Sequence, residues 1–542
     1  MRAESLGRTR GPFTRDRALV VGAGMGGLAC ALSLAQRGLY VTLLDSAPGP
    51  GGKMQPLVVG GAAVDSGPTV FTMRWVFEQL FEQAGASFAE RVPCDPLSVL
   101  ARHGWRGSND RLDLCARPAD SGAAIAAFSS AAEARRFRAF CEEAQRLYRH
   151  LEGPYIRSER PSMLSLMKDV GPGGLLALTG LGPFRSLWSA LSKRFTDPRL
   201  QQLFGRYATY CGASPWQAPA TLMLIAQVEM DGVWAVRGGM AQLAAAVAQL
   251  AAERGVVQRY GAQVAELLVE GGHARGVKLA DGQVLRADTV VFNGDVNALA
   301  TGHLGRAAAV VGSPRPVGQR SLSAMTWSVL APTQGWPLSR HNVFFDRDYA
   351  SEFRDIFGAA RFPQQPTVYV CAQDRLDGVP TGEGNGVVEA ERLLVLVNAP
   401  ACGDEQPGPS LAREQEMQSC QDRTFQLLST CGLQVHRHLG QEQRTTPWDF
   451  ERRFPSSAGS LYGPPTHGWM SAFRRGSARS PIPGLFLAGG SVHPGPGVPM
   501  ATMSGRLAAE TVMAHLDSTS PSRRVVISGG ISMRSAMTAS MP

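Results

Sequence analysis

Residues 17–45, RALVVGAGMGGLACALSLAQRGLYVTLLD, constrain the fold of this chain more than any other stretch. The pattern predicts a buried strand at 18–21, a glycine-rich turn, a helix that ends near Gln36 and a second strand that ends at Asp45. The turn has the spacing GxGxxG and comprises Gly22, Ala23, Gly24, Met25, Gly26 and Gly27. Glycines in such a turn let the backbone approach a pyrophosphate, and the helix N-terminus supplies N–H donors to its oxygens. The segment therefore predicts a Rossmann-type nucleotide-binding unit.

Asp45 refines this prediction. It lies eighteen residues after Gly27, where an acidic side chain accepts a hydrogen bond from a ribose hydroxyl. A carboxylate at this place repels a 2′-phosphate, so NADP is disfavoured. The glycine spacing itself is compatible with both NAD and FAD.

Composition and charge place the chain among large globular proteins. It has 542 residues, of which 44% are hydrophobic and 18% charged, and this suits two or more domains. The net charge is +9, and the densest basic stretch, residues 1–16, is expected to be a flexible arm that is either solvated or in contact with anionic lipid. Since aromatic residues do not alternate with the basic ones, we expect no nucleic-acid partner.

Cysteine usage and hydropathy narrow the cellular setting. The nine cysteines are scattered singly without a CxxC pair, which favours reduced thiols in a cytosolic protein and argues against disulfides and a metal site. An apolar run at 19–35 resembles a signal peptide or a membrane helix, but its glycines break it into strand, turn and helix. We therefore expect a soluble or peripherally membrane-bound protein.

Further glycine-rich segments accompany the N-terminal turn. Residues 48–53 read PGPGGK, and residues 64–71 read VDSGPTVF. Near the C-terminus, residues 488–505 read AGGSVHPGPGVPMATMSG, which predicts a strand end, a Pro/Gly loop and a helix that begins near Val498. A second helix N-terminus thus follows a glycine-rich loop, where it can stabilise negative charge.

Together these segments resemble flavoproteins of the glutathione-reductase-like superfamily, and their order is similar to that of the bacterial-type carotenoid desaturases. The resemblance spans about residues 17–516 and includes 204–222, 232–240, 341–349 and 446–463. It implies FAD as the cofactor. Besides the N-terminal turn, the residues that it places at FAD are Asp45, Gly51, Gly52, Lys53, Val264, Gly489, Gly490, Val498, Pro499 and Met500.

The same resemblance implies an α/β fold. We expect a glutathione-reductase-like, FAD-binding Rossmann domain assembled from discontinuous segments, and an α+β substrate domain with a helical part. The expected divisions are an FAD domain at 17–105, 225–295 and 470–516, a substrate and membrane-facing domain at 106–224 and 296–469, and a disordered tail at 517–542.

The C-terminal motif bears on the substrate. HPGPGVPM, residues 493–500, is similar to the branch of the family that introduces a 3,4 double bond into 1-hydroxylated acyclic carotenoids. Val492, Pro496 and Met500 depart from the T-H-P-G-A-G-I-P-G form that is common among phytoene desaturases. The resemblance therefore implies an FAD-dependent oxidoreductase that acts on 1-hydroxyneurosporene or 1-hydroxylycopene, in spheroidene-type carotenoid biosynthesis of purple photosynthetic bacteria. The alternatives are phytoene desaturation, another flavin oxidase such as an amine oxidase, and a non-catalytic lipid binder like the GDP-dissociation inhibitors.

A lipophilic substrate implies a membrane partner. We expect a cytoplasmic protein that lies peripherally on the inner or photosynthetic membrane and uses oxygen or a membrane quinone as electron acceptor. Residues 166–191, rich in Leu, Gly and Pro, are either a membrane-dipping substrate entrance or a buried helical hairpin.

The residues near the substrate are less well defined, and no catalytic residue is assigned. Arg206 and Tyr207 either face the flavin and a substrate hydroxyl or form a structural pair in the core. Trp234 and Arg237 occupy a turn that the resemblance places near the cofactor. His493 is either a base or, as we favour for a residue in a Pro/Gly loop, a side chain that shapes the loop.

Overall fold

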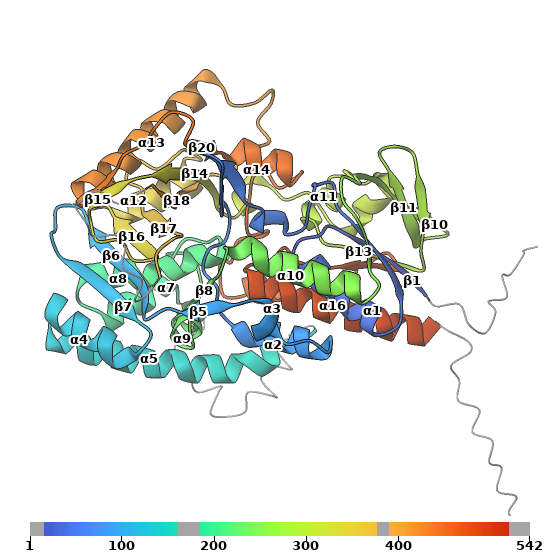
Figure 1. The fold of residues 1–542 in the computed structure, drawn as a ribbon, viewed down its shortest axis with the longest axis horizontal. Helices are drawn as coiled ribbons and strands as arrows, with labels where there is room; N and C mark the ends of the chain where they lie inside the picture. Colours follow the sequence, from blue (N-terminus) through green and yellow to red (C-terminus); the bar gives the residue numbers. More distant parts are fainter. Residues whose placement is uncertain (1–15, 160–184, 377–389, 520–542) are drawn as a thin grey trace, which may run out of the picture.

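The structure analysed is a computed structural model that describes residues 16–159, 185–376 and 390–519 (Figure 1). The expected basic arm, except its last residue, and the expected tail beyond Thr519 lie outside the described residues. So does most of the predicted entrance segment at 166–191.

The first sheet carries the predicted Rossmann unit and has five parallel strands in the order β21-β13-β1-β2-β9. Its strands come from distant parts of the chain, which confirms the predicted discontinuous domain. They are β1 (Arg17–Val21), β2 (Tyr40–Leu44), β9 (Val257–Arg259), β13 (Thr289–Phe292) and β21 (Leu485–Leu487). A three-stranded antiparallel sheet adjoins it, formed by β10 (Val264–Glu270), β11 (His273–Leu279) and β12 (Val284–Arg286).

Three helices pack on the five-stranded sheet. They are α1 (Met25–Gln36), α10 (Met240–Glu253) and α16 (Val498–Thr519). Figure 1 shows α1 and α16 side by side, although they lie at opposite ends of the sequence. Their apolar side chains share one core with α2 (Arg74–Gln83) and α3 (Phe88–Arg91).

The second sheet is mixed and has seven strands in the order β20-β14-β18-β17-β16-β6-β7. Only the β16·β6 pair within it is parallel among the described strands. The strands are β6 (Val99–Trp105), β7 (Arg111–Cys115), β14 (Ser323–Ala331), β16 (His341–Phe345), β17 (Val368–Ala372), β18 (Glu391–Ala399) and β20 (Glu442–Thr445).

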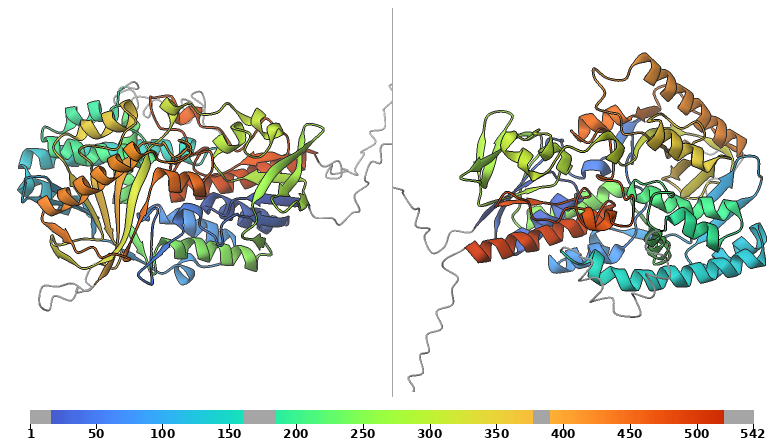
Figure 2. Two further views of the ribbon diagram at one scale, coloured as in Figure 1. Left: turned by 90° about the horizontal axis from the view of Figure 1, so that it is seen from above. Right: turned by 180° about the vertical axis from the view of Figure 1, so that it is seen from behind.

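Helices cover both faces of this sheet (Figure 2). On one face α13 (Leu411–Thr430) packs through Met417, Cys420 and Leu427 against side chains such as Trp327. The opposite face meets a helical layer with its own aromatic core. That layer comprises α4 (Pro118–Phe128), α5 (Ala131–Leu151), α7 (Leu187–Arg194), α8 (Pro198–Gly205), α9 (Leu224–Met230), α12 (Tyr349–Phe353) and the short turns at Glu152–Ile156, Arg206–Cys211 and Ala220–Met223. The predicted α+β substrate domain with a helical part matches this arrangement.

Some domain boundaries differ from the prediction, as for α9, which we expected in the FAD domain and which packs in the helical layer. Two further elements show the reason. β6, which we expected in the FAD domain, pairs with β16 and belongs to the seven-stranded sheet. α11 (Val296–Ala300), which we expected in the substrate domain, packs in the core beside the five-stranded sheet through Ala298 and Leu299. In both cases long-range pairing decides the domain, and a local sequence pattern does not contain that information.

The contact between α1 and α16 leads to a first prediction. A Cβ at Gly505 would lie 2.0 Å from the carbonyl oxygen of Gly26, so Gly505→Ala must push α16 away from α1. We expect the substitution to lower the free energy of unfolding by about 1–3 kcal/mol, measured from the midpoint of urea denaturation. Gly122→Ala is the matched control, because a Cβ there meets nothing within 4 Å and alanine favours helix α4. An unchanged midpoint for Gly505→Ala would show that the close approach does not matter for stability.

Candidate active site

A continuous cavity of about 1320 Å³ extends between the two sheets. At one end it is lined by the loops that follow β1, β13 and β21, namely Gly22–Gly26, Phe292–Asp295 and Gly489–Ser491. These strands are parallel neighbours, so their carboxyl ends open at the same edge of the sheet, where α/β proteins bind nucleotides. At the other end the lining comes from the seven-stranded sheet and the helical layer.

The loop between β1 and α1 is built from backbone. Gly22 has φ +102°, a conformation that favours glycine. A Cβ at Gly27 would lie 1.9 Å from the carbonyl oxygen of Gly22, so only glycine lets α1 start this close to the strand. The first turn of α1 contains no acidic side chain, and Gly24, Met25 and Gly26 line the cavity. This arrangement leaves N–H groups for an anionic ligand.

Asp45 lies at the end of β2 and also lines the cavity. Its carboxylate accepts hydrogen bonds from the N–H of Ala23 at 2.6 Å and of Ala47 at 2.8 Å. Burial raises the pKa of Asp45 even though both hydrogen bonds favour the ionised form. A carboxylate has room for about four hydrogen bonds, so Asp45 can accept further donors from a ligand. Val264, the first residue of β10, also lines the cavity. Two residues before it, the backbone N–H of Ala262 donates a hydrogen bond to the backbone carbonyl oxygen of Asp45 at 2.8 Å.

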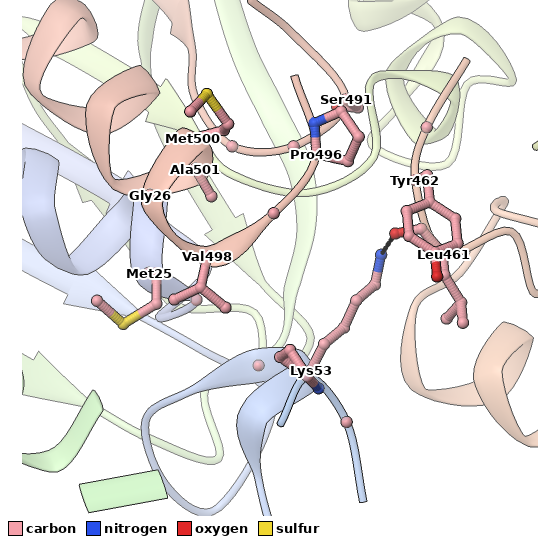
Figure 3. Close-up of a pocket in the computed structure, with 18 of the residues that line it drawn as sticks. Met25, Gly26, Lys53, Leu461, Tyr462, Ser491, Pro496, Val498, Met500 and Ala501 are labelled. Atoms are coloured by element: carbon pink, nitrogen blue, oxygen red, sulfur yellow. Dashed lines mark hydrogen bonds between the residues drawn. The ribbon is translucent and has the colours of Figure 1, made fainter. Parts of the chain in front are cut away.

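Lys53 and the start of α16 form the adjoining wall. Figure 3 shows Lys53 extending from the turn at Gly52–Met54 toward Leu461, whose carbonyl oxygen accepts a hydrogen bond from Nζ at 2.7 Å. Burial lowers the pKa of Lys53 to about 8. Val498, Pro499 and Met500 bring the N-terminus of α16 into the cavity. That terminus follows Gly497, which has φ +109°.

Asn293 and Arg475 hold these loops together, and we did not predict either from the sequence. Asn293 follows β13, donates from Nδ2 to the carbonyl oxygen of Gly22 at 3.1 Å, and would collide with a Cβ at Gly26 or Gly489. Arg475 donates to the carbonyl oxygen of Gly490 at 2.9 Å and to that of Pro464 at 2.6 Å. The only sequence signal for Asn293 was its place directly after a buried strand in VVFNGD.

Beyond the loops the cavity is mostly apolar. Register places Thr326, Leu396, Tyr369 and Val343 in one row across the seven-stranded sheet, and all four face the cavity. Side chains from the helical layer complete this part of the lining, and they include Leu151, Tyr155, Ile156, Leu222, Leu224, Ile225 and Val228.

One polar cluster interrupts the apolar lining. Tyr207 and Tyr210 donate hydrogen bonds to the two carboxylate oxygens of Glu229, each at 2.8 Å. Arg206 donates to the hydroxyl of Tyr210 at 2.6 Å, and its guanidinium lies 4.0 Å from Glu229. Arg206, Tyr210 and Glu229 line the cavity, whereas Tyr207 lies behind them and is 2% exposed.

Comparison with known proteins identifies the family. The sequence matches the family "Flavin containing amine oxidoreductase" over residues 25–321 and 384–513. It is 60% identical to a hydroxyneurosporene desaturase of Rubrivivax gelatinosus over 98% of this chain and 99% of that protein. The chain belongs to the flavin-containing amine oxidoreductase family. The predicted resemblance to carotenoid desaturases is confirmed as well, because a second hydroxyneurosporene desaturase, from Cereibacter sphaeroides, is 44% identical over 93% of this chain and 99% of its own length.

Solved structures share the fold of this chain. A putrescine oxidase bound to putrescine superposes with a TM-score of 0.57 at 15% identity, over 93% of this chain and 99% of that chain. An oxidoreductase from Methanosarcina mazei gives a TM-score of 0.54 at 16% identity, over 92% of this chain and 100% of that chain. The predicted fold class is therefore confirmed.

The loops after β1, β13 and β21 and the start of α16 form a cradle that fits FAD. FAD is the predicted cofactor, and membership of the flavoprotein family confirms it. Two helix N-termini, those of α1 and α16, open into the same cavity. Glycines bring three loops within contact there: a Cβ at Gly52 would lie 3.2 Å from Cα of Gly24, and one at Gly26 would lie 3.0 Å from Cα of Gly489. The resulting surface offers backbone donors to phosphates and Asp45 to a ribose hydroxyl. Among the described residues, no group of His, Cys, Asp and Glu side chains is arranged to hold a metal ion.

The structure brings most of the predicted site residues to one cavity. Those that line it are Gly22, Gly24, Met25, Gly26, Asp45, Gly51, Gly52, Lys53, Val264, Gly489, Gly490, Val498, Pro499, Met500 and Arg206. Ala23 and Gly27 support the same loop from behind through the contacts described above.

The remaining predicted residues lie elsewhere. Arg237 pairs with Asp95 at 2.7 Å and its side chain is 64% exposed. It therefore lies at the surface and not beside the cofactor site, where we predicted it. Trp234 packs edge-on against Phe71, away from the cavity lining. His493 packs edge-on against Tyr155, and burial lowers its pKa to about 4. A neutral, buried imidazole fits the loop-shaping role that we favoured over that of a base.

Asp45→Ala tests the ribose-binding role of Asp45. We expect the purified protein to bind FAD about 10- to 100-fold more weakly, because a hydrogen bond to a charged group contributes about 1.5–3 kcal/mol. Flavin absorbance after dialysis at graded FAD concentrations measures the change. Asp281→Ala is the control, since Asp281 is an exposed carboxylate in the turn between β11 and β12. Equal FAD affinity for both variants would contradict the assignment.

The lowered pKa of Lys53 predicts a pH effect on stability. Between about pH 8 and its ordinary value of 10.5 the unfolded chain holds the Lys53 proton while the folded protein releases it. The unfolded state then binds more protons, so stability should rise with pH in this window. We expect the wild type to gain stability relative to Lys53→Met as the pH rises from about 7 to about 9.5, measured by urea midpoints. Lys193→Met, which removes an exposed lysine, is the control, and a constant difference between wild type and Lys53→Met would refute the assignment.

Proposed function

We propose that the protein is an FAD-dependent desaturase that introduces the 3,4 double bond into 1-hydroxylated acyclic carotenoids, namely 1-hydroxyneurosporene and also 1-hydroxylycopene. The observation that carries this proposal is the apolar cavity that continues directly from the flavin cradle. Identity over nearly the whole chain to proteins named hydroxyneurosporene desaturase supports the substrate class.

An apolar cavity is what such a substrate requires. A polyene offers almost no polar atoms, so its binding free energy comes mainly from buried surface, at about 25 cal/mol per Å². Leu396 and Val343 on the sheet and Ile225 and Val228 of α9 all line the cavity, so these side chains can contact the hydrocarbon. They restrict sideways movement of the polyene. Its position along the cavity is then set by its end group.

The reaction removes two hydrogens from adjacent carbons, one as hydride and one as a proton. FAD, when bound, supplies the acceptor for the hydride. Positive charge at C4 is delocalised into the adjoining polyene, so the protein has little need of a strong base at C3. His493 fits this, because burial lowers its pKa to about 4 and it packs on Tyr155. The contribution of the chain is to hold the end group and exclude water.

A membrane location follows from the substrate. We infer peripheral association with the inner or photosynthetic membrane, because a carotenoid has no appreciable solubility outside lipid. Trp469 supports this, since it is 39% exposed and also lines the cavity. Within the described residues, no helix combines the length and apolarity that a membrane span requires.

Heterologous expression tests the function. In cells that accumulate 1-hydroxyneurosporene we expect a new pigment that absorbs at longer wavelength, because one further double bond extends the conjugated chain. Cells that accumulate phytoene should show no coloured product. Conversion of phytoene but not of the hydroxylated carotenoid would refute the proposed substrate, and amine oxidation without pigment change would refute the proposed class.

A further inference from the structure

The polar cluster of Arg206, Tyr210 and Glu229 is unusual for its surroundings. Arg206 is 7% exposed and Glu229 is 5% exposed, yet both contribute to the lining of a cavity that is otherwise mostly apolar. Burying a charged pair in such a place is unfavourable unless its hydrogen bonds are satisfied. The burial of this cluster in an apolar lining therefore calls for a functional explanation.

The hydrogen bonds within the cluster leave capacity unused. Arg206 lines the cavity and has five N–H donors, of which Nη1 donates to the hydroxyl of Tyr210 and Nη2 lies 4.0 Å from Glu229. Glu229 accepts one hydrogen bond at each oxygen, from Tyr207 and Tyr210, while the guanidinium stays 4.0 Å away. A free donor group and a free acceptor group thus stand side by side. An alcohol both donates and accepts one hydrogen bond at a single oxygen, so its chemistry matches this pair.

Three contacts place the cluster close to the cofactor end of the cavity. The hydroxyl of Tyr369 lies 2.7 Å from Oγ1 of Thr69 and 2.7 Å from Nδ1 of His341. Thr69 lies two residues after Gly67, where a Cβ would lie 1.8 Å from the carbonyl oxygen of Lys53. The turn that carries Arg206 and Tyr210 ends at Gly212, where a Cβ would lie 2.7 Å from the side chain of Tyr462. Tyr462 follows Leu461, whose carbonyl oxygen accepts the hydrogen bond of Lys53.

This position agrees with the spacing in the substrate. In a 1-hydroxylated carotenoid the carbon that bears the hydroxyl is two bonds from C3, so a group that binds the hydroxyl must lie close to the reacting carbons. A binding site for the hydroxyl at the far end of the cavity would place the wrong double bond at the flavin.

We infer that Arg206 and Glu229 form the subsite for the tertiary hydroxyl at C1 of the substrate, and that Tyr207 and Tyr210 position Glu229 for this contact. The inference rests on the proposed function. The hydroxyl donates to the carboxylate of Glu229 and accepts from the guanidinium of Arg206. These contacts set which end of the polyene enters the cofactor end of the cavity and how far it advances.

The subsite also predicts discrimination against carotenoids without the hydroxyl. A hydrocarbon end group would bury Arg206 and Glu229 against carbon with no new hydrogen bonds. Sites built around a substrate hydroxyl reject analogues that lack it by large factors, about 10⁴-fold or more in favourable cases. We therefore expect a preference for 1-hydroxyneurosporene over neurosporene that depends on this pair.

The test compares kcat/KM and Kd for these two carotenoids in detergent-solubilised, FAD-saturated protein. The Arg206→Met/Glu229→Leu double variant removes both charges together, so no unpaired charge is left buried. We expect kcat/KM and affinity for 1-hydroxyneurosporene to fall at least about 100-fold, while the values for neurosporene rise, because its hydrocarbon end group no longer buries a charged pair. Glu229→Gln keeps the side-chain shape and should lower the preference by about 10-fold, so it supplies the test if the double variant fails to fold.

The matched control is Arg375→Met/Glu391→Leu. This pair is equally buried, with side chains 12% and 5% exposed at a separation of 2.8 Å, but it lies outside the cavity lining. It should leave the preference unchanged. A preference that persists in both cluster variants, or that disappears in the control as well, would overturn the subsite while leaving the desaturase function intact. Failure of the wild type to convert 1-hydroxyneurosporene would instead reject the function and the subsite together.

Discussion

The site depends on the direct approach of backbone to backbone where α1, α16 and the loop after β13 meet. Gly505 brings α16 against the carbonyl oxygen of Gly26, and Asn293 fills the remaining space against Gly22 and Gly489. Side chains at these glycines would separate the three segments. Because two of the segments begin helices, the same contact that closes the core directs two helix N-termini toward one ligand.

This constraint explains why the cofactor end could be predicted in detail. The information lies in glycine spacing, which is local, so β1, α1 and the start of α16 at Val498 were placed correctly from sequence. Asn293 and Arg475 could not be found in that way. Each acts by bonding to the backbone of a loop far away in sequence, Gly22 for Asn293 and Gly490 for Arg475, and nothing in its own neighbourhood marks that role.

Predictions at the substrate end depended on pairings that sequence does not reveal. Trp234 and Arg237 lie in a glycine-containing turn like the cofactor loops, but β8 (Trp234–Val236) pairs with β5 (Cys94–Pro96), and Arg237 meets Asp95 at the surface. Arg206 was recognised as a candidate, whereas its partner Glu229 was missed because the two residues meet only after η3 (Arg206–Cys211) and α9 have packed together. The misplacement of β6 has the same origin, since only its pairing with β16 assigns it to the second sheet.

The two ends of the cavity therefore follow different physical rules, and this difference bears on how such proteins diverge. The cradle offers a flavin chiefly backbone N–H groups, which every residue except proline carries, so substitutions there are limited by sterics more than by chemistry. The apolar middle recognises shape weakly, and many hydrophobic side chains serve equally well. Selectivity among carotenoid end groups must then reside in the few polar side chains of the lining. Arg206 and Glu229 are a charged pair of that kind in the described lining, and the proposed subsite predicts that replacing them changes the preferred end group without disturbing the cradle.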